Sequence, residues 1–313
     1  MIRYLKNNEI NTEKWDECIM NAFNGIVYAY SWYLDIVHET WDALIEGDYE
    51  RVMPLPVSEK CGVSYIFQPF FVQQLGVFSK SILTPDITQS FIQHIPDKYK
   101  LVDLNLNSYN MLDSSELDVI KNKNHVLDLI NRYPTLSARY ASNTKRNLKK
   151  SQKKKLSLVK GIKPENLIQL FRTNKGKEIK KWGETEYQRL HRLMYMAIYK
   201  GRGLVYGVFG EQNQLCAGAF FLKSHNRLIF LFSAADQLGK ETAAMTYLID
   251  SVIQEFSPGK LVLDFEGSNL KNLARFYKGF GAKEVEYTRF RRNNLNIGLN
   301  ILYKLMVKVK NYR

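Results

Sequence analysis

The sequence contains few of the residues that hold metals or form disulfide frameworks. Its three cysteines, Cys18, Cys61 and Cys216, lie far apart without a CxxC pair, and its five histidines show no metal-ligand spacing and no triad. This pattern argues against a zinc site and against a disulfide-stapled secreted domain. We therefore expect no metal, no tightly bound cofactor and a reducing compartment.

Long apolar segments are also missing. The N-terminal stretch MIRYLKNNEINTEKW has no apolar core of signal-peptide length. No apolar run approaches the roughly 20 residues that a membrane-spanning helix needs. We expect a cytoplasmic protein and leave peripheral membrane association open.

Acidic residues are absent from two long stretches, and the net charge of the chain is +14. Eight lysines and arginines lie between Arg139 and Lys155 with no acid among them, and no acid follows Glu286. This charge balance suggests an anionic partner, which can be nucleic acid, a phosphorylated substrate or an anionic membrane.

The first basic stretch is predicted to be a helix. Ser142 or Asn143 can cap it, and no proline or glycine interrupts it before its expected end near Lys154. Like charges four residues apart cost roughly 0.2–0.5 kcal/mol per pair, which favours anion binding over the alternative of a solvated helix face. The candidate nucleic-acid-binding residues are Lys145, Arg146, Lys149, Lys150 and Lys153. No aromatic residues interleave the lysines, so base stacking is not expected.

The length of 313 residues and the hydrophobic content of 45% leave room for two domains with real cores. In residues 137–313 the pattern predicts helices, a three-strand meander, a helix, a strand, a helix and a final strand. Residues 1–136 follow a looser version of this plan. We therefore place the domain boundary between residues 136 and 137.

One segment of the second domain carries more polar residues than a turn needs. In LVLDFEGSNLKNLARFYKGFGAKEVEY, an apolar strand is followed by a helical pattern. The polar residues between them include Asp264, Glu266, Gly267, Ser268 and Asn269. Helix capping is the favoured explanation for Ser268 and Asn269, and a substrate cleft at the strand end explains the surplus.

The order of elements in residues 137–313, together with NLKNLARFYKGFGA (Asn269 to Ala282), resembles the GNAT acyltransferase fold. The strand end DFEGS, the helix FYKGFG and the linker NTKRNLKKSQKKKLSLVKG resemble the FemABX group of tandem GNAT proteins more specifically. This resemblance covers Ser137 to Phe290, and the first half matches only in plan and in YIFQPFFVQQLGVF. It implies an α/β (α+β) fold of two tandem GNAT-like domains, 1–136 and 137–313. Each would have a mixed, mostly antiparallel sheet flanked by helices.

The resemblance also implies an activity. FemABX proteins transfer amino acids from aminoacyl-tRNA to peptidoglycan precursors, whereas ordinary GNAT enzymes use acyl-CoA. We expect an N-acyltransferase whose leading donor is aminoacyl-tRNA and whose candidate acceptor is the amine of a cell-wall precursor. An acyl-CoA-dependent N-acetyltransferase and a non-catalytic binder of nucleic acid or anionic membrane stay as alternatives. We expect a monomer.

Acyl transfer to an amine needs a base for the amine, donors for the oxyanion and a proton for the leaving group. The candidate catalytic residues are Tyr277, Glu266 and Asp264, and we favour Glu266 over Asp264 as the base because it lies closer to the loop. Tyr277 stands where the FemABX group usually carries a lysine, and a tyrosine in this GNAT helix can protonate the leaving group. Its reference pKa of about 10 keeps it protonated at neutral pH. The alternative is that Tyr277 packs inside the domain.

The donor loop departs from the GNAT pattern. In that fold a Gln/Arg-x-x-Gly-x-Gly/Ala loop before a helix holds the CoA pyrophosphate with backbone N–H groups. The corresponding segment here is ADQLGKETAAMTYL, in which Gln237, Gly239, Lys240 and Thr242 are the candidate donor phosphate-binding residues. Because their spacing departs from the pattern, we favour a donor other than CoA.

Two further groups are candidates for substrate contact. Gln68, Gln73 and Gln74 stand among apolar strand residues, where buried amides either bind a ligand or satisfy the backbone. In the second domain the candidates are Ser268, Asn269 and Arg275. The basic amphipathic tail after Asn293 can dock on its own core or lie on an anionic bilayer, which would suit a lipid-linked acceptor.

Overall fold

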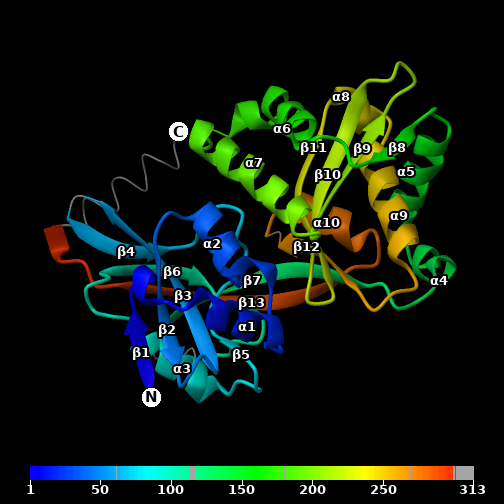
Figure 1. Cartoon of the computed structure of the whole chain (residues 1–313). Coiled ribbons are helices and arrows are strands. Elements are labelled where there is room, and N and C mark those ends of the chain that lie inside the picture. The colour runs from blue at the N-terminus through cyan, green and yellow to red at the C-terminus, as the bar shows by residue number, and fades with distance from the viewer. Residues whose placement is uncertain (61, 113–116, 180, 268, 299, 301–313) are drawn as a thin grey trace. The chain divides into compact units, whose positions relative to one another are not determined.

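The chain forms two units that are joined by two long strands. The computed structural model describes residues 1–60, 62–112, 117–179, 181–267, 269–298 and 300 (Figure 1). The N-terminal unit comprises Met1–Lys121 and Tyr287–Arg313, and the central unit comprises Asn122–Glu286.

The units divide the chain at different points from the boundary that we placed between residues 136 and 137. Strands β7 (Asp118–Asp128) and β13 (Lys283–Asn293) each begin in one unit and end in the other. The end of β13 pairs with β6, where Arg289 lies opposite Asn105. The last strand therefore returns to the N-terminal unit, which the order of elements along the sequence does not reveal.

The N-terminal unit contains a mixed sheet in which most strand pairs are antiparallel. Its strands follow the order β1-β2-β3-β4-β6-β13, with β5 paired to β3. The remaining strands are β1 (Ile2–Leu5), β2 (Trp41–Glu46), β3 (Arg51–Lys60), β4 (Val63–Phe67), β5 (Phe78–Ser79) and β6 (Leu101–Asn105). The described pairs are antiparallel except that β4 and β6 run parallel.

The described part of this unit contains three α-helices, two of which begin at a side-chain cap. They are α1 (Thr12–Asn21), α2 (Ser31–Val37) and α3 (Pro85–Gln93), with short 3₁₀ turns η1 (Asn7–Glu9) and η2 (Val27–Ala29). The Asn11 side chain accepts a hydrogen bond from the Lys14 backbone N–H, and Thr84 accepts one from Ile87. A polar side chain at this position satisfies a backbone N–H that the helix leaves without a partner.

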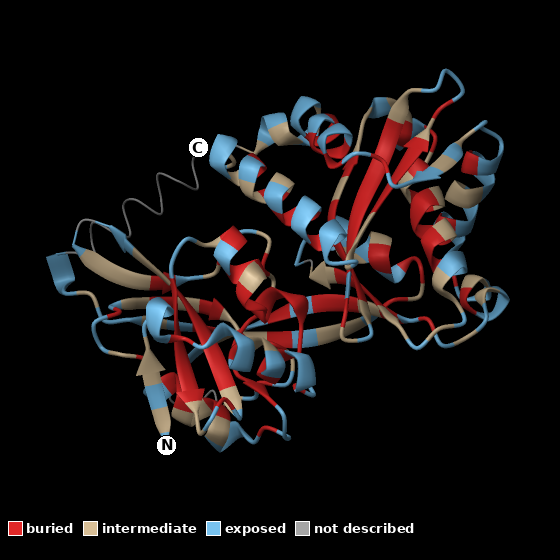
Figure 2. Cartoon of the chain, in the orientation of Figure 1, coloured by how far each residue is buried: buried red, intermediate tan, exposed pale blue. Residues whose placement is uncertain are grey.

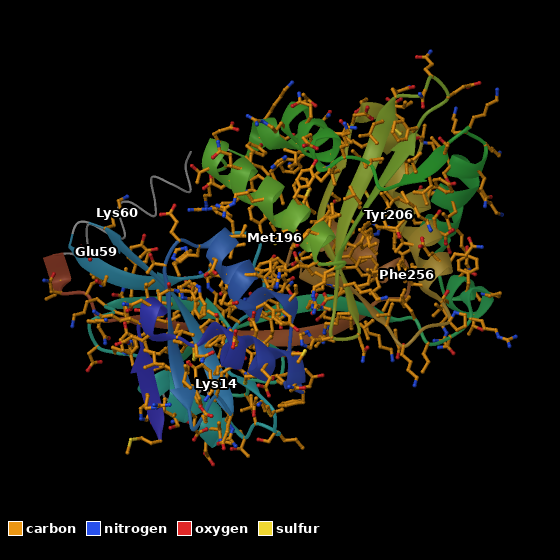
Figure 3. All side chains as sticks on the ribbon, viewed as in Figure 1. Lys14, Glu59, Lys60, Met196, Tyr206 and Phe256 are labelled. Carbon is orange, nitrogen blue, oxygen red and sulfur yellow. The ribbon has the colours of Figure 1, made fainter. Side chains whose placement is uncertain are left out.

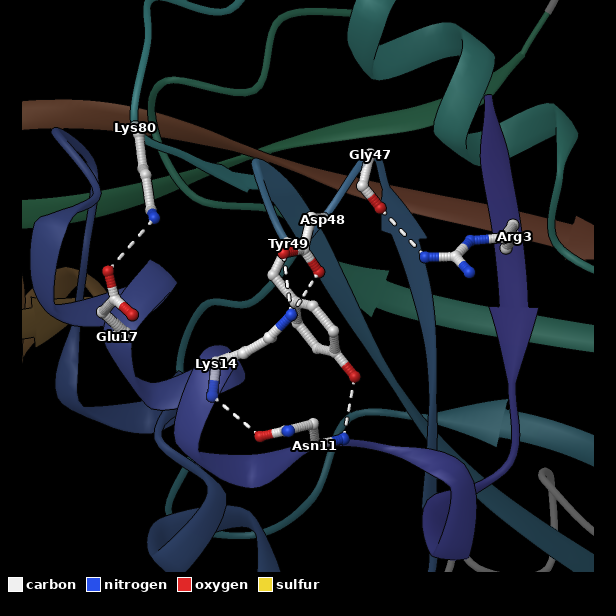
Figure 4. A network of polar contacts seen from close by, with 8 residues as sticks. All are labelled: Arg3, Asn11, Lys14, Glu17, Gly47, Asp48, Tyr49 and Lys80. Carbon is white, nitrogen blue, oxygen red and sulfur yellow. Dashed lines mark hydrogen bonds and ion pairs between the residues drawn. The ribbon is translucent and has the colours of Figure 1, made fainter.

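A polar network ties the β2–β3 turn to the start of α1 (Figure 4). Lys14 Nζ lies 2.7 Å from Asp48 Oδ2, and the Asn11 backbone N–H donates to the Tyr49 hydroxyl over 2.7 Å. Arg3 donates to the carbonyl of Gly47 from β1. Because the Lys14–Asp48 ion pair is exposed, it contributes little to stability.

The central unit follows the element order that the sequence predicted up to the last strand, β13, which ends in the N-terminal unit. Its strands follow the order β7-β12-β11-β10-β9-β8, in which β9, β10 and β11 form an antiparallel meander and β11 runs parallel to β12. These strands are β8 (Ser157–Lys160), β9 (Gly203–Phe209), β10 (Leu215–Ser224), β11 (Arg227–Ala235) and β12 (Val262–Gly267). The helices are α4 (Tyr133–Ala138), α5 (Ser142–Gln152), α6 (Pro164–Thr173), α7 (Glu184–Tyr199), α8 (Gln237–Glu241), α9 (Ala244–Phe256) and α10 (Lys271–Lys278), with the 3₁₀ turn η3 (Lys175–Glu178). The mixed α/β fold class is therefore confirmed.

The core of the central unit lies along β10 and β11 and under one face of α9. Figure 2 shows these strands as largely buried. The residues of α9 are buried or half-buried, apart from Gln254 and Glu255 near its end, which are exposed. Figure 3 labels Tyr206 of β9, whose hydroxyl donates to Glu255 near the end of α9, and Phe256, which packs against the same core. This apolar layer supports the ends of β12 and α10, where the candidate catalytic residues lie.

The structure bears on the membrane expectations in two ways. Among the described helices, none is both long and apolar enough to cross a membrane. The amphipathic tail predicted after Asn293 falls largely outside the described residues, which end at Asn300.

Candidate active site

The strand β12 ends in an irregular turn at Glu266. This residue has a positive φ of 55°, and the register between β12 and β7 shifts between Asp264 and Gly267. A non-glycine residue in this region of backbone space costs roughly 1–2 kcal/mol. Such outliers gather at functional sites, where the surrounding structure holds them in place. The backbone therefore marks the end of β12 as a candidate site.

Asp264 holds this turn in place. Its carboxylate is buried, with Oδ2 2.8 Å from Arg227 Nη1, and Oδ1 accepts hydrogen bonds from the Asn124 side chain and the Glu266 backbone N–H. These contacts occupy both oxygens. The geometry assigns Asp264 a positioning role at the turn rather than direct contact with a substrate.

Tyr277 lies in the core of the central unit, with 8% of its surface exposed. Its ring stacks on Phe265 with centroids 4.7 Å apart, and the His125 ring lies 6.0 Å away. Burial raises the pKa of Tyr277 well above its ordinary value, and the Glu266 carboxylate raises it further. The hydroxyl is therefore protonated at neutral pH and makes no hydrogen bond with another described residue.

The structure thus brings two of the three predicted catalytic residues close together. Tyr277 of α10 stacks on Phe265, the residue before Glu266 in β12, and the Glu266 carboxylate raises the pKa of the tyrosine. A carboxylate and a protonated hydroxyl can serve as a proton acceptor and a hydrogen-bond donor in the same reaction. Ser268, which was predicted to bind substrate, lies outside the described residues.

Asn269 has a different local role from the one expected. Helix α10 begins at Lys271 after Leu270, with no side-chain cap, so the expected cap at Asn269 is wrong. Its amide instead donates to Asn122 Oδ1 over 2.8 Å and accepts from the Lys123 backbone N–H over 3.2 Å. These contacts attach the turn before α10 to β7, because a β-strand offers backbone groups along its length.

Two predicted substrate contacts line a common pocket. Asn269 and Arg275 both face a cavity of about 630 Å³ beside α10. Its other charged lining residues are Lys123, Lys271, Lys278 and Glu284. The spacing of Lys271, Arg275 and Lys278 on one helix face is visible in the sequence, but their meeting with Lys123 and Glu284 depends on the tertiary structure.

The candidate donor-phosphate residues make contacts within the protein. The Gly239 backbone N–H donates to the capping Asp236 side chain over 2.7 Å, and the Thr242 hydroxyl donates to the Leu238 carbonyl over 2.8 Å. The Gln237 side chain donates to Glu241, while Lys240 is exposed. The Gly239 N–H and the Thr242 hydroxyl, which could hold a pyrophosphate, thus already have partners within the protein. The Asp236 carboxylate would in addition repel a pyrophosphate.

Gly239 has a packing reason to be glycine. A Cβ atom at this position would lie 2.2 Å from the Cys216 carbonyl oxygen of β10. The absence of a side chain therefore allows α8 to approach β10 closely. This close approach explains the glycine without a bound phosphate.

The three glutamines of the N-terminal unit contact the protein itself. Gln68 accepts from the Asn105 backbone N–H and donates to the Val72 carbonyl. Gln74 accepts from the Ser108 backbone N–H and donates to the Gln73 side chain over 2.6 Å. Three of these bonds satisfy backbone groups, at Val72 and at Asn105 and Ser108 in and after β6, which agrees with one of the two interpretations of the sequence.

The predicted basic helix is α5, which runs from Ser142 to Gln152. Lys145 donates to the Ala138 carbonyl over 2.7 Å, and Arg146 donates to the Asn143 side chain over 2.6 Å. The exposed cations of this surface are Lys145, Arg146, Lys149, Lys150 and Lys153. Within the described residues none of them forms an ion pair, which leaves their positive charge for an external anion.

Comparisons with known proteins identify the fold. No protein-family model and no curated protein matches the sequence. The crystal structure of FemX matches with a TM-score of 0.62 and 10% identity, covering 97% of this chain and 99% of that chain. The C-terminal domain of a putative lysylphosphatidylglycerol synthetase from Agrobacterium fabrum matches with a TM-score of 0.59 and 8% identity, covering 93% and 94%. L-PGS from Bacillus licheniformis matches with a TM-score of 0.54 and 10% identity, covering 96% and 97%. The chain therefore has a FemX-like fold, which confirms the predicted resemblance at the level of structure.

Proposed function

We propose that this protein transfers an aminoacyl group from aminoacyl-tRNA to an amine. The observation that carries this choice of donor is the engaged loop at α8, where Asp236 already holds the Gly239 N–H that a pyrophosphate would need. The FemX-like fold supports acyl or aminoacyl transfer in general. A cell-wall precursor with a free amine is the acceptor class that the sequence resemblance favours.

The proposed mechanism uses Glu266 at the end of β12 and Tyr277 of α10. Glu266 accepts the proton of the attacking amine, which frees the nitrogen lone pair to form the new amide bond. Tyr277 donates a hydrogen bond to the departing ribose oxygen, whose bond to the acyl carbon breaks, and this oxygen takes up the proton that Glu266 removed from the amine. Because the raised pKa of Tyr277 makes full proton transfer from the phenol difficult, its main contribution is hydrogen bonding to the developing charge.

The helix α5 would hold the nucleic acid. Its four cations and Lys153 at its C-cap have no ion-pair partner among the described residues, so phosphates can bind them without first breaking an ion pair. Each phosphate that is neutralised releases counterions, which makes the affinity depend on salt. This contribution carries no base specificity, in keeping with the absence of interleaved aromatic residues.

The test is a transfer assay with two donors in parallel. The full chain would be incubated with a mixture of labelled aminoacyl-tRNAs or with labelled acetyl-CoA, each with peptidoglycan precursors as acceptors. We expect label transfer from aminoacyl-tRNA and at least a tenfold loss in Tyr277→Phe, as expected when a transition-state hydrogen bond is removed. Transfer only from acetyl-CoA would replace this proposal with the acetyltransferase alternative.

A third outcome would separate catalysis from binding. If tRNA binds but no label moves, and Tyr277→Phe leaves that binding unchanged, the chain is a nucleic-acid binder rather than a transferase. Glu266→Gln is the companion variant, because it removes the proposed base while keeping a side chain of similar size. Loss of transfer in both variants with unchanged tRNA affinity would support the two assigned roles.

A further inference from the structure

The pocket beside α10 has an unusual charge for its size. We call it the α10 pocket and define it by Lys123 of β7, Asn269, three residues of α10 (Lys271, Arg275 and Lys278) and Glu284 of β13. Four of these side chains are cationic and one is anionic, so the walls carry a net charge of +3. A concave surface lined mainly by one sign of charge attracts ligands of the other sign.

Glu284 engages two of the cations. Its Oε1 lies 2.8 Å from Lys123 Nζ and its Oε2 lies 2.6 Å from Lys278 Nζ. These hydrogen bonds lower the pKa of Glu284 to about 2, so the carboxylate is ionised at neutral pH. Arg275 and Lys271 also line the pocket and form no ion pair with a described residue.

A buried histidine lies behind Glu284. His125 is fully buried, and neither ring nitrogen has a hydrogen-bond partner among the described residues. Its Nε2 lies 4.0 Å from Glu284 Oε2, which is beyond a normal hydrogen bond. A buried polar group without a partner is unfavourable, and such a group calls for an explanation.

We propose that the α10 pocket binds the phosphate group of an organic phosphate and that Glu284 occupies its lysines when the ligand is absent. A phosphate offers three acceptor oxygens and more negative charge than a carboxylate, so it suits the group formed by Lys123, Lys278 and Arg275. When it takes the two lysines, Glu284 needs a new partner. His125 can serve as this partner, because its Nε2 lies 4.0 Å from Glu284 Oε2 and its neutral imidazole has one N–H to donate.

The size of the pocket argues for an organic ligand. A volume of about 630 Å³ lies in the range of small-molecule and cofactor sites and far exceeds one phosphate group. The phosphate can therefore belong to a nucleotide-linked small molecule or to the end of an RNA strand. This proposal does not depend on the proposed transferase activity, because it concerns binding alone and uses neither Tyr277 nor Glu266.

The test is isothermal titration of the full chain with inorganic pyrophosphate, UDP and an RNA trinucleotide at about 0.15 M salt, which screens weak surface attraction. Arg275→Ala should weaken binding about tenfold, the expected loss for a charge-assisted hydrogen bond. Glu284→Gln should strengthen binding about fivefold, because it removes the internal anion that competes for both lysines. Lys177→Ala is the matched control, since Lys177 is exposed on η3 and does not line the pocket.

The outcomes are distinct. Tighter binding of UDP than of the trinucleotide supports the pocket with a nucleotide-linked ligand, and the reverse order supports it with an RNA end. An equal loss in Lys177→Ala and Arg275→Ala, or weaker binding in Glu284→Gln, would overturn the proposal. If Arg275→Ala does not fold by circular dichroism, Lys271→Ala replaces it with the same expected direction.

Discussion

Glu266 combines a backbone outlier with a proposed catalytic role, and the two can be separated by substitution. Its positive φ of 55° is accessible to glycine at little cost. We expect Glu266→Gly to raise the free energy of unfolding by about 0.5–1 kcal/mol and Glu266→Gln to change it by less than about 0.5 kcal/mol. Urea denaturation measures both.

The transfer activity of Glu266→Gly and Glu266→Gln tests the catalytic role separately from stability. Both remove the carboxylate, so both should lose aminoacyl transfer although they differ in stability. Full activity in the more stable glycine variant would show that Glu266 is not the base.

Asp264 is expected to matter for stability. It is 2% exposed and pairs with Arg227, so its removal leaves a partly buried guanidinium without its partner. Asp264→Ala should lower the free energy of unfolding by about 2–4 kcal/mol, somewhat less than for a fully buried pair. Lys14→Ala, which breaks the exposed pair with Asp48, should cost less than about 1 kcal/mol. Equal decreases in melting temperature for Asp264→Ala and Lys14→Ala would contradict this prediction.

At the scale of elements, α8 packs so closely on β10 that Gly239 admits no side chain. A methyl group there would meet the Cys216 carbonyl oxygen, which belongs to the backbone and cannot move aside easily. We expect Gly239→Ala to lower the free energy of unfolding by about 1–3 kcal/mol, as overpacking does. A calorimetric melting curve measures the effect. An unchanged melting temperature of Gly239→Ala would contradict the packing explanation for this glycine.

Three elements meet at Glu284, because its strand β13 is joined through ion pairs to Lys123 of β7 and Lys278 of α10. The pKa of Glu284 falls from an ordinary 4.5 to about 2 in the folded protein. A lowered pKa means that the carboxylate stabilises the fold above pH 4.5 and that this contribution is lost as the pH falls towards 2. Urea midpoints of the wild type should therefore fall more steeply over this range than those of Glu284→Gln. Parallel pH curves would show that the ion pairs contribute nothing.

At the scale of the whole molecule, a net charge of +14 means that many polyanions bind weakly at low salt. The contribution of α5 can be isolated from this background. Removing Lys149 and Lys150 together should reduce the slope of log affinity for tRNA against log salt by roughly 0.7–0.9 per lost phosphate contact. Lys155→Ala is the control, since Lys155 already pairs with Glu211. An equal change in slope for the control would mean that the charge acts as a whole and not through α5.

Much of the local structure follows from the sequence alone. The alternation and turn residues of 203–235 predict a meander, and Asn11 and Thr84 predict the starts of α1 and α3, because these signals act between neighbouring residues. The acid-free block around α5 predicts an exposed cationic helix for the same reason. The segment from Leu261 to Tyr287 identifies the strand and helix that carry Glu266 and Tyr277, since the surplus of polar residues is local.

Only the tertiary structure decided how these local pieces are used. The sequence does not show that β13 returns to the N-terminal unit, that Asp264 meets Arg227, or that Lys123 and Glu284 face α10. It also does not show that His125 is buried without a hydrogen-bond partner among the described residues. Each of these facts joins residues from separate elements, and such contacts depend on long-range packing that no local pattern encodes.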